Sequence, residues 1–289
     1  MVAAIGNPLS WTARMIGLGG QGLGHGIGEI GGRAETPIGI AEIDSQDLRI
    51  ALRKGLEDFM ALRTDVMFLV LVYPMIGILM IGMALHAAML PLIFPMISGF
   101  ALLGPVAAIG LYEMSRRRER GLHVSWANAL DVMQSPAFLP IVVLGGYLCA
   151  LFVAWMLVAW WLFTVTLGPD LPVTATAFLR DVFTTAAGWV MLAAGVMIGG
   201  AFAMLALAIS LVSFPLLLDR HVGLPVAVTT SVRVVAQNPR AALAWGGLVV
   251  AMLGLGVLTA FIGLVIALPV LGHATWHLYR RAVVALPRG

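Results

Sequence analysis

The chain has 289 residues, of which 61% are hydrophobic and only 11% are charged, and its formal net charge is +3. Soluble domains contain about 45–50% apolar and about 25% charged residues, so this composition excludes an ordinary soluble globular protein. The small positive charge does not indicate nucleic-acid binding. The basic residues flank hydrophobic runs, which is typical of the cytoplasmic loops of membrane proteins.

The first 42 residues are rich in glycine and lack the continuous apolar core of a signal peptide. Gly17–Gly32 also lacks the Gly-Lys-Ser/Thr sequence of a nucleotide-binding loop. We therefore expect residues 1–42 to be a flexible cytoplasmic tail, and residues 43–284 to form a membrane domain.

Asp47–Leu62 has the pattern of an amphipathic helix. Four apolar residues fall at helical spacing, while the charged residues between them face elsewhere; the apolar residues are Leu48, Leu52, Leu56 and Phe59. This pattern suits a helix that lies in the membrane interface. An ordinary amphipathic helix packed on cytoplasmic loops is the alternative.

Four later stretches contain no Asp, Glu, Lys or Arg: Val66–Tyr112, Val132–Pro169, Val182–Leu218 and Ala241–Tyr279. Each exceeds the ~20 apolar residues that a spanning helix needs. Such continuous runs form helices in a bilayer, whereas barrel strands alternate over ~10 residues.

The first run is long enough to cross the bilayer twice, and the most polar, proline-containing part, His86–Pro91, predicts the turn. This gives helices at about Val66–Leu85 and Leu90–Tyr112. The next two runs predict one helix each, at about Phe138–Leu167 and Thr184–Phe214.

The fourth run allows one helix with an interfacial extension, or two short helices that meet near Thr259–Gly263. Arginines follow it at 280, 281 and 288, and other basic clusters precede the first helix and follow the second and fourth. The positive-inside rule places all of these in the cytoplasm, which requires an even number of spans.

The sequence therefore predicts an all-α polytopic bundle of six transmembrane helices with both termini cytoplasmic. A weak repeat groups them as three hairpins, each preceded by an interfacial amphipathic helix; these helices are Asp47–Leu62, Trp126–Met133 and Val226–Ala236. On the fourth span, Gly195, Gly199 and Ala203 form a stripe of small residues that allows another helix to approach closely.

Five polar residues are predicted to meet at the cytoplasmic ends of the helices: Glu113, Asp219, Arg220, His273 and His277. An ion-pair cluster that holds helices together and a substrate or regulatory site are both open. Since His273 and His277 lie four apart, they share one helical face, which we expect to turn inward toward the second and fourth helices. This spacing also allows metal or haem ligation, but no third ligand lies nearby in sequence, so no cofactor is predicted.

The predicted spans contain no acidic residue that would mark a proton path, which counts against a proton-coupled transporter. No Gly-x-Ser-x-Gly or His-Glu-x-x-His signature of a catalytic site occurs in the chain. We therefore predict that the protein is not an enzyme.

Four segments resemble a bacterial family of integral membrane proteins catalogued as a domain of unknown function. They are residues 47–59, residues 99–116, residues 213–220 and the closing Leu-Pro-Val-Leu-Gly-His-Ala-Thr-Trp-His-Leu-Tyr-Arg-Arg of residues 268–281. The resemblance spans about residues 38–284 and is most specific in the closing segment. It implies a bacterial inner-membrane protein, and no established activity comes with it.

Three functions follow as hypotheses. The first is a non-enzymatic accessory or assembly factor that acts through a membrane-protein partner or a second copy. The second is a small-molecule or ion transporter, and the third is a haem- or metal-binding redox protein based on His273 and His277. The lipid bilayer is the common partner of all three.

Overall fold

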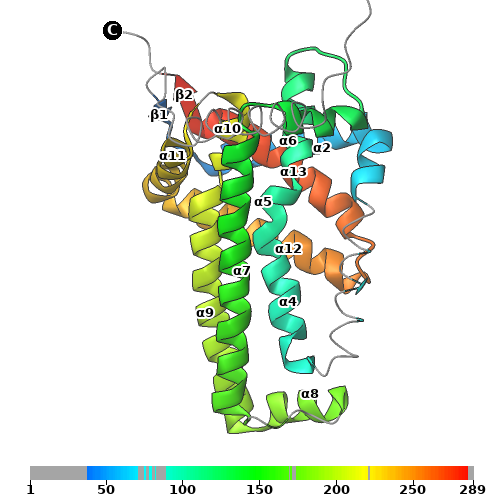
Figure 1. Ribbon diagram of the computed structural model, residues 1–289, viewed down its shortest axis with the longest axis vertical. Helices are drawn as coiled ribbons and strands as arrows, with labels where there is room; N and C mark the ends of the chain where they lie inside the picture. The colour runs from blue at the N-terminus through cyan, green and yellow to red at the C-terminus, as the bar shows by residue number, and fades with distance from the viewer. Residues whose placement is uncertain are drawn as a thin grey trace, which may run out of the picture.

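The computed structural model describes residues 38–70, 75, 78–79, 82, 89–168, 170, 174–220 and 222–285. Within these residues the fold is all-α apart from one two-stranded sheet (Figure 1). The longer helices are α2 (Ser45–Val70), α6 (Ile109–Glu119), α7 (Phe138–Thr166), α8 (Ala175–Thr184), α9 (Ala186–Ser210), α11 (Leu224–Gln237), α12 (Pro239–Leu258) and α13 (Leu264–Ala282). The shorter elements are β1 (Ile38–Ile40), η1 (Leu90–Leu92), α4 (Ile93–Phe100), η2 (Ala101–Leu103), α5 (Gly104–Ala107), η3 (Trp126–Gln134), α10 (Ser213–Asp219) and β2 (Val283–Ala285).

Four helical segments of the described chain are long and apolar enough to cross a membrane: Leu90–Glu119, Phe138–Thr166, Ala186–Asp219 and Pro239–Leu258. They correspond to the predicted second to fifth spans. Most of the predicted first span, Val66–Leu85, lies outside the described residues, as does His86 in the predicted turn. α13 is not one of the four candidate spans, because its C-terminal half is polar.

The α7–α9 pair is the longest part of the molecule in Figure 1, and α8 lies at its far end. The opposite end carries the sheet, α2, α10, α11 and the ends of α6 and α13. Elements with most of the charged residues therefore gather at one end of the bundle, which is the arrangement that the charge pattern of the sequence predicts for a single membrane face.

The predicted second span is a chain of short helices instead of one regular helix. α4 ends at Phe100, the 3-10 turn η2 follows, and α5 begins at Gly104 with Pro105 in its first turn. Proline has no N–H to donate to the preceding turn and its ring clashes with that turn's carbonyl. This explains why the helix is interrupted just before Pro105.

The fourth apolar run forms two helices, of which only the first is long and apolar enough to be a candidate span. α12 ends at Leu258, and Ala260 and Phe261 have φ values of 53° and 68°, which no helix contains. The Thr259 hydroxyl accepts a hydrogen bond from the Gly263 N–H (3.0 Å), and α13 begins at the next residue. The break lies at the predicted position, Thr259–Gly263.

Ile38–Ile40, which the sequence analysis placed in the tail, pairs antiparallel with Val283–Ala285. Asn238 holds the chain just after this strand: its side chain accepts from the Ile43 N–H (2.7 Å) and donates to the Ala41 carbonyl (3.2 Å). Residues 38–42, which were assigned to the tail, therefore contact the rest of the described fold, and its first described segment is joined to its last.

All three segments predicted as interfacial helices are helical, as α2, η3 and α11. α2 differs from the prediction because it continues without a break to Val70, into the predicted first span. No proline or glycine lies between Leu56 and Val70 to interrupt it.

Candidate functional site

Close packing of α2 against α13 creates a buried polar site. The two helices approach at Gly55, where an added Cβ would lie only 2.6 Å from the Ala274 side chain. The buried face of α2 comprises Ala51, Gly55, Asp58 and Leu62. The predicted apolar face is only partly correct, since Leu56 is 47% exposed.

Asp58 lies at the centre of this site and is only 4% exposed. Its Oδ2 accepts hydrogen bonds from the Ser115 hydroxyl (2.6 Å) and from His277 Nε2 (2.8 Å). Its Oδ1 pairs with the Arg118 guanidinium. Three groups from two other helices, α6 and α13, therefore converge on one carboxylate of α2.

His273 extends this network by one step, because its Nδ1 lies 2.8 Å from the Ser115 hydroxyl. A serine hydroxyl has one proton, and here Asp58 accepts it. His273 must therefore donate from Nδ1. The result is a directed chain of hydrogen bonds from His273 through Ser115 to Asp58.

The surroundings of Asp58 keep its carboxylate ionised. Burial alone would raise the pKa of this group, but the hydrogen bonds from His277 and Ser115 outweigh that effect and hold the pKa below its ordinary value of 3.8. A buried carboxylate with these partners acts as a fixed negative charge. Its ion pair and hydrogen bonds link α2, α6 and α13.

A second polar cluster connects the end of α13 to α10 and α6. Asp219 accepts from the Tyr279 hydroxyl (2.8 Å), Arg280 (3.2 Å) and Arg120 (3.1 Å). Glu119 accepts from Trp276 Nε1 (2.9 Å) and from Arg280 Nε (3.1 Å).

A third cluster surrounds Glu113, which is 2% exposed. Arg116 and Arg117 of the same helix pair with it at 2.7 and 3.4 Å. Arg116 also donates to the Leu218 carbonyl (2.9 Å), and Arg117 pairs with Asp131 of η3 (3.1 Å).

The five polar residues predicted from the sequence therefore lie at one end of the bundle but in separate groups. His273 and His277 share the Asp58 site, Asp219 and Glu113 belong to the other two clusters, and Arg220 forms no ion pair with any described residue. Both histidines are buried and face protein partners, which agrees with the inward orientation expected from their spacing.

Sequence reasoning missed Asp58, Ser115 and Arg118. The available signal was the spacing of two small residues, Ala51 and Gly55, with an acid three positions later on the same helical face. Within the described ranges, no three His, Cys, Asp or Glu side chains are grouped to hold a metal ion.

The small-residue stripe of α9 faces α7 and an adjacent cavity. A Cβ on Gly199 would lie 3.0 Å from the Trp155 ring, and one on Gly195 would lie 3.7 Å from Leu162. Trp155 is held in place by a hydrogen bond from its Nε1 to the Pro95 carbonyl (2.9 Å). Gly195, Gly199 and Ala203 all line the cavity.

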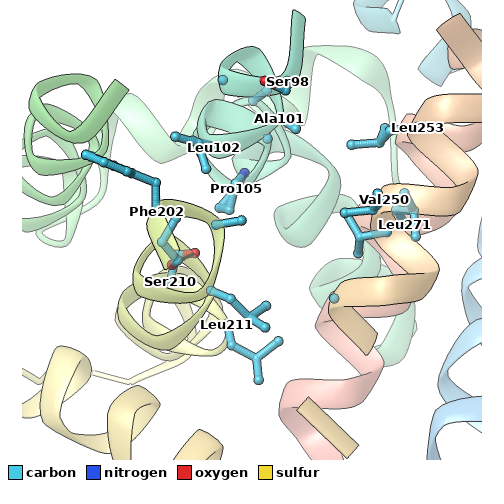
Figure 2. A pocket seen from close by; sticks show the side chains of 18 of the residues that line it. Ser98, Ala101, Leu102, Pro105, Phe202, Ser210, Leu211, Val250, Leu253 and Leu271 are labelled. Atoms are coloured by element: carbon cyan, nitrogen blue, oxygen red, sulfur yellow. Dashed lines mark hydrogen bonds between the residues drawn. The ribbon is translucent and has the colours of Figure 1, made fainter. Parts of the chain in front are cut away.

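This apolar cavity has a volume of about 360 Å³ and lies between the α4–α5 segment, α9, α12 and α13 (Figure 2). The hydroxyl groups of its serine and threonine residues are already used: Ser98 donates to Pro95, Ser210 to Ala206 and Thr275 to Leu271, each to a carbonyl of its own helix. Val196 and Val250 line it and are 66% and 65% exposed, so the cavity opens to the outer surface of the bundle.

A polar cavity of about 440 Å³ lies between the start of α7, η3, α6 and the end of α10. Its charged lining residues are Arg116, Arg120, Arg220, Asp131 and Asp219.

Part of the chain is similar to a family of known proteins. Residues 93–219 match the family described as a predicted integral membrane protein, DUF2189, a domain of unknown function. The predicted resemblance to a membrane-protein family of unknown function is thereby confirmed for this segment, which holds three of the four candidate spans. The match does not include α2 or the closing segment on α13. No curated protein and no solved structure matches the chain.

Proposed function

We propose that this membrane protein acts by binding rather than by catalysis, as an accessory or assembly factor for other membrane components. The observation that carries the proposal is the apolar cavity, which opens to the surface of the bundle and whose Ser98, Ser210 and Thr275 hydroxyls are all bonded internally. Such a cavity favours apolar groups, because it offers no free polar partner from these side chains.

The polar clusters also support the proposal, because their acidic residues are poorly placed for catalysis. Asp58, Glu113 and Asp219 are each engaged by two or more side chains of the protein itself. Groups used in this way stabilise helix packing and are poorly suited to act as general acids or bases on a substrate.

The proposal includes six spans, with both termini on the cytoplasmic side of a bacterial inner membrane. Its support is the grouping of Arg116, Arg120, Arg220 and Arg280 at one end of the helices. Reporter fusions after Met114, Pro169 and Gly289 should report inside, outside and inside. An external C-terminus would refute the six-span topology.

Site-specific photo-crosslinking in native membranes tests the binding function. A photoreactive residue in place of Val250 faces the cavity, and one in place of Leu255 on the same helix is similarly exposed (64%) but lies outside the lining. We expect one discrete protein adduct from position 250 that is absent from position 255. Identical adducts from the two positions would contradict a partner site at the cavity.

A small-molecule transporter is the second candidate, favoured by the same cavity because it lies among candidate spans. Substrate flux into vesicles that contain the purified protein would promote it over the accessory role. The redox hypothesis is less favoured, because His277 Nε2 bonds to Asp58 and His273 Nδ1 to Ser115, and of these nitrogens' ring partners only His273 Nε2 is buried without a hydrogen bond in the described chain. An absorbance spectrum of the purified protein tests it directly.

A further inference from the structure

The polar cavity lies where two candidate spans end. Ser135, Pro136 and Ala137 line it immediately before the span Phe138–Thr166. Leu217, Leu218 and Asp219 line it at the last residues of the span Ala186–Asp219. Since both spans end beside it, the cavity lies at the level of the lipid headgroups.

Exposed apolar side chains beside the cavity support this placement. Met133 of η3 and Phe138 of α7 are 61% and 38% exposed, and they flank the lining segment Gln134–Ala137 in sequence. Apolar groups that flank a polar segment in this way reach into the hydrocarbon while the polar groups remain in the interface.

The charges of the cavity do not cancel. Arg116 is paired with Glu113, Arg120 with Asp219, and Asp131 with Arg117. Arg220 is half-buried and has no ion-pair or hydrogen-bond partner for its side chain among the described residues. One guanidinium group is therefore left over in a cavity large enough for a small ligand.

Two further donors are unused by the described protein groups. The Gln134 side chain has no hydrogen-bond partner in the described part of the chain. The Ser135 hydroxyl oxygen accepts from the Ala137 N–H (3.2 Å), so its own proton remains free to donate. The cavity thus offers a cation and two neutral donors.

We propose that this cavity binds the phosphate-bearing headgroup of an anionic phospholipid, with Arg220 as the principal contact. Guanidinium groups bind phosphate oxygens through two parallel hydrogen bonds, and basic pockets between transmembrane helices on the cytoplasmic side are suited to anionic headgroups. The site is separate from the apolar cavity, and the inference holds whichever partners the protein serves.

Native mass spectrometry of the full chain, released from mixed phosphatidylglycerol and phosphatidylcholine vesicles, tests the proposal. The wild-type protein should retain phosphatidylglycerol in preference to phosphatidylcholine. Arg220→Gln should lose this preference, because it removes the unpaired charge without breaking an ion pair. Arg220→Lys should retain part of it, since ammonium keeps the charge but not the two-pronged geometry.

Arg233→Gln is the matched control, because Arg233 is exposed on α11 and lies outside the cavity. It changes the net charge equally, so equal losses in both Gln variants would overturn a specific site. Unchanged phosphatidylglycerol retention in Arg220→Gln would also overturn a specific site.

A second arm separates lipid from soluble phosphate. Added inorganic phosphate should leave phosphatidylglycerol retention unchanged, because a lipid is also held by its chains. Displacement of the lipid by inorganic phosphate would refute a lipid site. Gln134→Leu, a substitution at an exposed position, gives an independent test and should weaken retention less than Arg220→Gln.

Discussion

The α2–α13 contact and the α7–α9 contact both depend on glycine, but they have opposite consequences. At Gly55 two backbones approach, and polar side chains from three helices close around Asp58. At Gly199 an aromatic ring of α7 fills the space, and the neighbouring volume remains an apolar cavity. Close approach is therefore accompanied by a buried polar network where charged residues flank the contact, and by an apolar cavity where none do.

The largest effect is expected when the first contact is broken. Gly55→Leu places atoms inside the Ala274 backbone and side chain, which are parts of a helix that cannot shift freely. Overpacking of this kind should cost about 3 kcal/mol or more, measured by thermal unfolding in detergent. Gly247→Leu is the control, since an added Cβ there meets nothing within 4 Å. Equal stability of both variants would show that the α2–α13 contact is loose.

Removal of the Asp58 charge, at the centre of the polar network between α2, α6 and α13, should have the next largest effect. Asp58→Asn leaves Arg118 without its ion pair and weakens the bond from His277. We expect a loss of about 2 kcal/mol, less than for a fully buried pair because the Arg118 side chain is 40% exposed. Chemical unfolding in detergent measures it, with Glu57→Gln as the control for an exposed acid on the same helix. No difference between the two variants would mean that the network adds nothing to stability.

The corresponding substitution in the second contact should be milder. Gly199→Leu displaces the Trp155 ring, which borders a cavity and has space to move, so we expect a loss of about 1–2 kcal/mol. Thermal unfolding and Trp fluorescence of the variant should both change, whereas Gly146→Leu on α7, where an added Cβ meets nothing, should change neither. An unchanged Gly199→Leu variant would show that the stripe faces lipid.

The smallest effect is a difference in acid sensitivity. The folded pKa of Asp58 lies below its unfolded value of 3.8, so the stability it contributes is present above pH 3.8 and is lost as the pH falls through the folded pKa. Below pH 3.8 the wild-type protein should therefore lose stability faster than Asp58→Asn. Parallel curves for the two proteins would contradict the lowered pKa.

The sequence by itself determined the features that depend on local composition. Charge-free runs located the four candidate spans, and the break at Thr259–Gly263 lies where the sequence predicted it. These features could be predicted because hydrophobicity adds up along a segment, and because proline and glycine act on their own neighbours. The irregular α4–α6 segment was missed although Pro105 marks it, since its apolar character alone suggested a continuous helix.

Only the tertiary structure decided which polar side chains meet. Asp58 and His277 are separated by 219 positions, and their hydrogen bond exists because Gly55 lets α2 approach α13. The five polar residues predicted to meet are divided among separate clusters for the same reason. Rotating a helix by one residue exchanges one set of side-chain partners for another. The charge pattern of the sequence does not fix that rotation. Arg220 forms no ion pair within the described residues, and the carboxylate of Asp219 beside it is bonded instead to Arg120, Tyr279 and Arg280, which only the tertiary structure brings together.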